Sequence, residues 1–396
     1  MRSTALHLTA GSLVLSLAAL VGCKSDTDTE THASTSRSYS GTASVGDFLT
    51  VKLDTAAHTM RYRNVTNGDD YTVPYTTGSD GTYHFTDTTG NLVAGYEVPG
   101  YAMVISATKA GPGKDTPAVI TAIQTTTVTT DVFKSKSYNY MQFRTNSGGM
   151  ELGHISCDAS GNIAQTGYWP FGASQSSPDT FNNGDMPITG VVPNTDHSAL
   201  TLTMDEGHGP ETNYIFATPA GFLAVDTPNG AIVCVQGRSS SAFDAASMAG
   251  TYKAILYSKE GCSTMTGNVE HSTSQSVDTG TLVISSAGHI TVRDAGGTTL
   301  VDDKVLTPLA DRADIVGTHK LEDPCAGTFS FTLTDGGGTR DVFLSFLNDA
   351  VLIASYTAHA PNDYDYFYGV GLRGLPTGIG ALPHAASAAL AASSLH

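Results

Sequence analysis

Short apolar runs with strand character fill most of this chain, and turn residues separate them. In the first part of the chain the runs cover residues 48–53, 60–65, 71–75, 82–86, 92–98 and 101–107. The turn pairs Asn67-Gly68 and Pro99-Gly100 stand between successive runs. Closely spaced short strands with such punctuation are typical of an antiparallel meander. The pattern therefore predicts consecutive β-hairpins.

The second half continues this pattern, with apolar runs at 281–285 and 290–293 and a glycine turn between them. Helical periodicity is nearly absent, and a short helix is expected only near 242–248. We predict an all-β protein of two antiparallel β-meander domains, each a barrel or a sandwich. A Gly/Arg/Ser stretch at 237–241 marks the boundary between a domain at 38–240 and a second at 245–372.

Length and composition agree with this division. The chain has 396 residues, more than one typical domain, and its hydrophobic fraction of 40% suffices for packed cores. A formal net charge of −17 repels phosphate backbones, so nucleic acid is excluded as a partner. The same charge repels anionic lipid headgroups, so attachment to a membrane requires a lipid rather than a basic patch.

The first residues have the pattern of a secretory signal. Arg2 precedes an apolar segment at 6–20, which ends in Leu20-Val21-Gly22-Cys23. This Leu-x-Gly-Cys box after a short apolar core resembles the signal of bacterial lipoproteins. The resemblance implies that residues 1–22 are removed, that the Cys23 thiol carries diacylglycerol, and that the new amine is acylated, for example with palmitate.

Two segments lie outside the predicted domains. Residues 23–37 hold no aliphatic side chain larger than that of Ala33 and read as a solvated tether. In residues 373–396 proline and glycine break the first half and the alanine-rich end supports at most a marginal helix, so this segment reads as a flexible tail, with a docked helix as the alternative. Lys24, which follows Cys23 directly, is similar to the residue found there in lipoproteins sorted to an outer membrane. The expected location is the envelope of a Gram-negative bacterium, lipid-anchored at the outer membrane.

Four cysteines remain when Cys23 carries lipid: Cys157, Cys234, Cys262 and Cys325. An even number in an exported chain favours disulfides. Of the three pairings, Cys157–Cys234 and Cys262–Cys325 keep each bridge inside one predicted domain. Buried free thiols are the alternative.

The start of the second domain offers a fold analogy. A Gly-x-aromatic opening strand at Gly250-Thr251-Tyr252, followed by a meander, is similar to a lipocalin-type barrel over residues 249–358. The tryptophan expected at that aromatic position is Tyr252 here. The analogy implies a carrier of a small apolar ligand and concerns the fold alone.

Few residues have the spacing that catalysis requires. Asp205, Glu206, His208 and Glu211 form the most site-like cluster, which could bind a metal or hold a general base, but a solvated hairpin loop is the favoured interpretation. No Gly-x-Ser-x-Gly elbow or phosphate-binding glycine loop occurs. Acidic turns at 67–70, 182–185 and 362–365 each offer fewer oxygens than calcium needs. We therefore predict no catalytic residues, no metal and no cofactor.

Aromatic residues carry the better functional signal. Tyr168, Trp169 and Phe171 lie in a segment framed by Gly167, Pro170 and Gly172, which predicts a loop. Rings exposed on a loop stack on sugars or contact protein partners, although core packing is the competing interpretation. A second set, Tyr364, Tyr366 and Tyr368, alternates along one expected strand, where packing in a core is again the alternative.

Together these patterns predict a lipid-anchored envelope protein that is not an enzyme. Its expected role is to bind or scaffold an envelope protein or a glycan. A lipocalin-like carrier and a secreted hydrolase of polysaccharide or ester are the alternatives.

Overall fold

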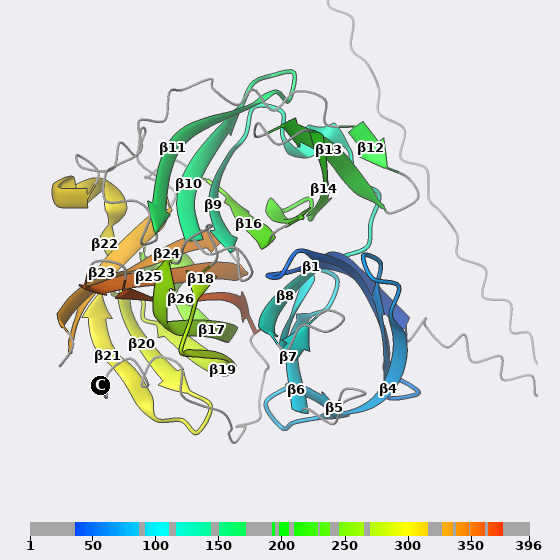
Figure 1. Cartoon of the computed structure of the whole chain (residues 1–396), viewed down its shortest axis with the longest axis horizontal. Coiled ribbons are helices and arrows are strands. Elements are labelled where there is room, and N and C mark those ends of the chain that lie inside the picture. The colour runs from blue at the N-terminus through cyan, green and yellow to red at the C-terminus, as the bar shows by residue number, and fades with distance from the viewer. Residues whose placement is uncertain are drawn as a thin grey trace, which may run out of the picture. The chain divides into compact units, whose positions relative to one another are not determined.

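The computed structural model describes residues 36–86, 92–110, 116–143, 150–171, 192–194, 198–205, 210–228, 230–237, 245–264, 270–315, 327–335, 338–347, 349–360 and 363–374. Three antiparallel sheets follow one another along this part of the chain (Figure 1). The predicted all-β fold class is confirmed, and the predicted short helix is α1, Ala245–Met248. Among the described residues, no helix is long and apolar enough to cross a bilayer.

The first sheet is a closed barrel in which eight strands pair in sequence order. Its strands are β1 (Ser36–Ala43), β2 (Asp47–Asp54), β3 (Thr59–Asn64), β4 (Asp70–Thr77), β5 (Tyr83–Thr86), β6 (Leu92–Val98), β7 (Ala102–Ala110) and β8 (Thr116–Gln124). Pairing of β1 with β8 closes the barrel, with Gly41 opposite Ala122. A Cβ at Gly41 would lie 2.0 Å from the Thr121 carbonyl oxygen, so only glycine fits this contact.

The barrel interior is packed by side chains. Leu49, Met60 and Phe85 belong to its apolar core. Near the start of β1, the guanidinium of Arg37 donates two hydrogen bonds to the carboxylate of Glu97, at 2.5 and 2.6 Å. The hydroxyl of Tyr83 donates to the same carboxylate at 2.7 Å, so the Glu97 side chain, which is 1% exposed, has its acceptors satisfied.

The second sheet has eight strands in the order β11-β10-β9-β16-β15-β14-β13-β12. They are β9 (Ser137–Phe143), β10 (Met150–Cys157), β11 (Ile163–Phe171), β12 (Val192–Asn194), β13 (Ala199–Asp205), β14 (Pro210–Ala217), β15 (Phe222–Thr227) and β16 (Gly230–Gln236). A short 3₁₀ helix, η1 (Thr130–Val132), precedes β9. Because β9 pairs with β16, the first and last long strands of the segment are neighbours at the middle of the sheet.

The third sheet has ten strands, nine of them in the order β21-β20-β19-β17-β26-β25-β24-β23-β22, with β18 paired to β17. They are β17 (Gly250–Thr264), β18 (Glu270–His271), β19 (Ser274–Ile284), β20 (His289–Asp294), β21 (Thr299–Val305), β22 (Thr307–Pro308), β23 (Thr328–Asp335), β24 (Gly338–Leu347), β25 (Ala350–Ala360) and β26 (Asp363–Arg373). Leu306 alone separates β21 from β22, so the two edges of the sheet meet there and the sheet curls like a barrel. Its core includes Leu256, Val292 and Phe346.

One apolar core is shared by all three sheets. It contains Val104 of the barrel, Phe143 of the second sheet and Tyr368 of the third. The ring of Phe48 in the barrel lies 5.0 Å from that of Phe216 in β14. Three sheets around a shared core are the observed arrangement, whereas the division into folding units at 38–240 and 245–372 stays a prediction.

Candidate functional site

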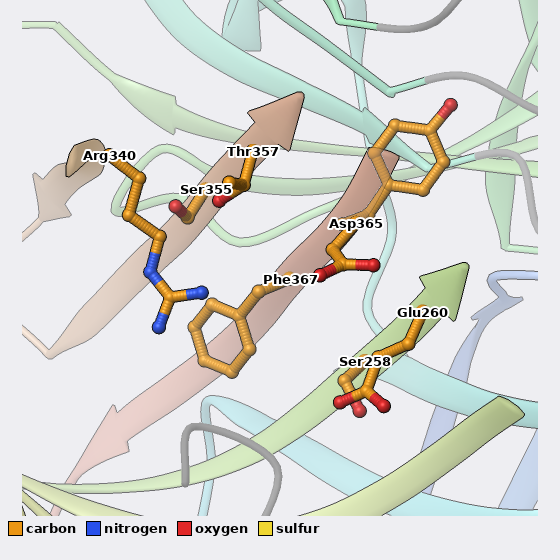
Figure 2. Close-up of a pocket in the computed structure, with 8 residues that line it drawn as sticks. Ser258, Glu260, Arg340, Ser355, Thr357, Asp365 and Phe367 are labelled. Carbon is orange, nitrogen blue, oxygen red and sulfur yellow. The ribbon is translucent and has the colours of Figure 1, made fainter. Parts of the chain in front are cut away.

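The candidate site is a small recess in the third sheet, near the starts of β24 and β26 and the end of β25 (Figure 2). Strands β17, β26, β25 and β24 lie side by side here and contribute its lining. The cavity volume is about 10 Å³, which is room for one water-sized group. The lining residues are Ser258, Glu260, Arg340, Ser355, Thr357, Asp365, Tyr366 and Phe367.

A β-bulge shapes one wall of this recess. Lys259 pairs with Tyr366 and Cys262 with Tyr364, so Glu260 and Gly261 together stand opposite Asp365. Gly261 has φ 56°, a left-handed conformation that favours glycine. Its backbone N–H donates to Oδ1 of Asp365 at 2.8 Å. The bulge thus adds a residue to β17 and brings a backbone donor to the Asp365 carboxylate.

Two carboxylates face the recess from these neighbouring strands. Oδ2 of Asp365 lies 2.6 Å from Nε2 of His359 on β25. Oε2 of Glu260 accepts a hydrogen bond from the hydroxyl of Ser274 at 3.0 Å. Oε1 of Glu260 is buried and has no hydrogen-bond partner among the described residues. A buried acceptor without a donor is costly, and ordered water or a ligand commonly supplies one.

The rest of the lining combines one cation, hydroxyls and one ring. Arg340 is 9% exposed, and it lines the recess together with the Phe367 ring (Figure 2). The Ser258 and Ser355 positions pair directly with Phe367, so these three side chains share one face of the sheet. Two carboxylates and one guanidinium leave the recess with a net charge of −1 when His359 is neutral. It can hold a small polar or cationic group.

A larger and more open groove lies beside η1. Its volume is about 220 Å³, close to the lower end of ligand-binding pockets. Threonine hydroxyls, Lys136 and Pro219 line it, with Val128 among the apolar lining residues. Its side chains come from the β8–η1 connection, η1, the η1–β9 connection, the end of β14 and the β14–β15 turn. Asp131 and Lys136 are the charged residues of this lining.

The predicted aromatic loop is a strand. Tyr168, Trp169 and Phe171 belong to β11, where Trp169 pairs with Leu152 and Phe171 with Met150 of β10. The loop prediction was wrong because β11 is an edge strand, and proline is tolerated at sheet edges. Pro170 sits at this edge, opposite Glu151. Their side chains fall outside the described structure, so ligand stacking by these rings stays a prediction.

The predicted Cys157–Cys234 bridge is absent, and both residues are free, buried thiols. Cys157 lies on β10 and Cys234 on β16, with β9 between them. Strands two places apart are separated by about 9–10 Å, which exceeds the Cα separation that a disulfide spans. Cys262 is buried in β17, whereas Cys325 lies outside the described residues, so the Cys262–Cys325 bridge stays a prediction.

The other candidates are placed only in part. Asp205 ends β13 and Glu211 lies in β14, whereas Glu206, His208 and the lipidation site Cys23 lie outside the described residues. Within the described ranges, no group of three or more His, Cys, Asp or Glu residues is arranged to hold a metal ion. The stripe of tyrosines on β26 packs in the shared core at Tyr366 and Tyr368, as the alternative interpretation expected.

Sequence reasoning missed a buried acidic contact between the barrel and the second sheet. The hydroxyl of Thr42 in β1 donates to Oδ1 of Asp226 in β15 at 2.8 Å. Burial, together with the nearby Asp47 carboxylate, raises the pKa of Asp226 to about 7. Asp47 is itself buried and accepts a hydrogen bond from the Asn64 amide at 2.9 Å. Thr42 and Asp226 are 184 positions apart, so no local pattern could pair them.

The recess was missed for a similar reason, because its charged residues lie on three different strands. The only sequence signal was the acidic turn at 362–365, which includes Asp365. The fold places Asp365 at the end of β26 beside the Glu260 bulge.

Comparison with known proteins reveals no close relative. No protein-family model matches the chain, and no curated protein matches it. Among solved structures, a tryptophan-to-alanine mutant of transferrin binding protein B from Haemophilus parasuis is similar over 83% of this chain, at 10% identity and a TM-score of 0.25. Transferrin binding protein B from serogroup B Neisseria meningitidis is similar over 83% of this chain, at 10% identity and a TM-score of 0.22. The chain spans 66% of the length of each of these structures.

Proposed function

We propose that this chain is a lipid-anchored envelope protein that binds an envelope protein partner and has no catalytic role. The lipobox-like signal that ends at Cys23 supports the anchor and the outer-membrane location. The acidic surface is compatible with such an anchor, because attachment through lipid needs no basic patch.

The observation that carries the binding role is the edge position of β11. This strand is nine residues long, and none of the other described strands pairs with its outer edge. An open edge is a template for strand addition, in which main-chain hydrogen bonds give affinity and side chains give specificity. Tyr168, Trp169 and Phe171 on this strand are residue types enriched at protein interfaces.

Photo-crosslinking in intact cells tests this role. With p-benzoylphenylalanine at Gln165 of β11, we expect one discrete adduct, which Trp169→Ala weakens. The same residue at Asp302, exposed on β21 at the edge of the third sheet, is the matched control. Identical adducts from both positions, or none from Gln165, would refute binding through β11. Binding of the parent, but not of Trp169→Ala, to a glycan array would instead assign the rings to sugars.

The anchor is tested separately by labelling cells with an alkynyl fatty acid. The parent chain should take up the label and fractionate with outer membranes, whereas Cys23→Ala should remain unlabelled. A labelled Cys23→Ala chain would refute the lipidation site.

The packed interiors support binding at the surface over the lipocalin-like carrier. Leu49 and Met60 fill the barrel, and Tyr252 is buried in the core of the third sheet with its hydroxyl donating to the Met248 carbonyl at 2.9 Å. An apolar ligand inside either sheet would have to displace such side chains.

A further inference from the structure

We propose that the recess between β17 and β26 binds one primary ammonium group, carried at the end of an unbranched chain, between the carboxylates of Glu260 and Asp365. This inference rests on the proposed binding role, but it concerns a different surface from β11. Three observations support it independently: an acceptor without a donor, the charge of the lining, and the size of the recess.

The acceptor is Oε1 of Glu260, which is buried and has no hydrogen-bond partner in the described part of the chain. The other oxygen of this carboxylate already accepts from Ser274, and both oxygens of Asp365 have partners in Gly261 and His359. An ammonium group has three N–H donors, so it can satisfy Oε1 and contact Asp365 at the same time. Hydrogen bonds between charged partners are also the stronger ones.

The charge of the recess also favours an ammonium ligand. Among the lining residues, Glu260 and Asp365 contribute two negative charges and Arg340 one positive charge, so one ammonium ion offsets the excess negative charge of the lining. A carboxylate or phosphate ligand at Glu260 would meet like charge.

Size restricts the ligand to the tip of a chain. The cavity volume of about 10 Å³ admits one water-sized group, which matches –NH₃⁺ but not a trimethylated nitrogen. The ligand must therefore present its ammonium on a thin stem. A lysine side chain of a polypeptide and a free alkylamine share this chemistry, and the test separates these two sources.

The test uses the full mature chain in detergent and follows its thermal stability and calorimetric heats during titration. n-Butylamine should raise the melting temperature, because a ligand that binds only the folded state stabilises it. N,N,N-trimethylbutylammonium, which has the same charge, should not. A short lysine peptide that binds more tightly than butylamine, and loses binding on Nε-acetylation, assigns the site to polypeptide lysine. Equal affinity for the lysine peptide and for butylamine assigns the site to free amines.

Glu260→Gln keeps the size of the side chain and removes its charge, so butylamine affinity should fall about tenfold or more. Asp302→Asn, which removes an exposed carboxylate of the same sheet, should leave the affinity unchanged. Equal responses to butylamine and its trimethyl analogue would overturn the proposal, as would a Glu260→Gln chain that binds like the parent. Either result would leave only an ordered water in the recess. Crosslinking from Gln165 would be unaffected, so failure here is distinct from failure of the proposed function.

Discussion

The ring of Tyr368 in β26 stacks on the ring of Phe143 in β9, with centroids 3.7 Å apart and planes 10° from parallel. Tyr257 of β17 also stacks on Tyr368, with ring centroids 4.7 Å apart. Tyr368 is 3% exposed and thus joins the second sheet to the third inside the shared core. Stacked rings contribute beyond their buried area.

Tyr368→Ala should lower the free energy of unfolding by about 3–5 kcal/mol, because it removes a large buried ring and leaves a cavity. Urea unfolding followed by circular dichroism measures this change. Tyr71→Ala is the control, because Tyr71 is 36% exposed and its loss should cost far less. Equal losses from the two variants would mean that the contact between the sheets contributes little.

Replacing Arg37, the ion-pair partner of the Glu97 carboxylate in the barrel, should destabilise the protein as strongly as Tyr368→Ala. The Glu97 side chain is 1% exposed, and Arg37 holds it at 2.5 Å. Arg37→Ala would leave a buried carboxylate without its cation, for which about 3–5 kcal/mol of lost stability is expected. Arg61→Ala breaks an ion pair with Asp70 that is 56% and 36% exposed, and a far smaller loss of stability is expected there, because solvent screens exposed ion pairs. Chemical denaturation of the two variants side by side distinguishes these outcomes.

Stability should fall as pH rises from about 4 to about 7. The pKa of Asp226 is raised from 3.8 to about 7, so the folded chain holds a proton in this window that the unfolded chain has released. The stabilisation is complete below the unfolded pKa and is lost as pH approaches the folded one. Asp226→Asn should flatten this dependence, whereas Asp302→Asn should keep the parent slope. Urea midpoints at several pH values test the effect, and an unchanged slope in Asp226→Asn would contradict it.

The buried thiols should react slowly in the folded protein. Burial raises the pKa of Cys157 to about 12, so little reactive thiolate forms at neutral pH. Alkylation with iodoacetamide, read by peptide mass spectrometry, should label Cys157 and Cys234 only after unfolding. A Cys157–Cys234 linked peptide in a non-reduced digest would show that the bridge forms after all.

Local sequence patterns predicted most of the strands. The predicted run 92–98 coincides with β6, and the short helix near 242–248 contains α1. Both predictions rest on residues adjacent in the chain, where apolar runs and turn residues act directly on the backbone. The predicted loop around Trp169 failed because glycine and proline mark an edge strand as readily as a loop.

The sequence by itself determined the all-β class and the turns between hairpins, because each is set by neighbouring residues, whereas the signal at the N-terminus stays a prediction. Only the tertiary structure decided that β9 would separate Cys157 from Cys234, that Thr42 would contact Asp226, and that Glu260 would face Asp365. These contacts depend on which strands pair and in what register. Burial of whole sheet faces selects the strand pairing and its register, and the spacing of residues along the chain does not reveal this selection.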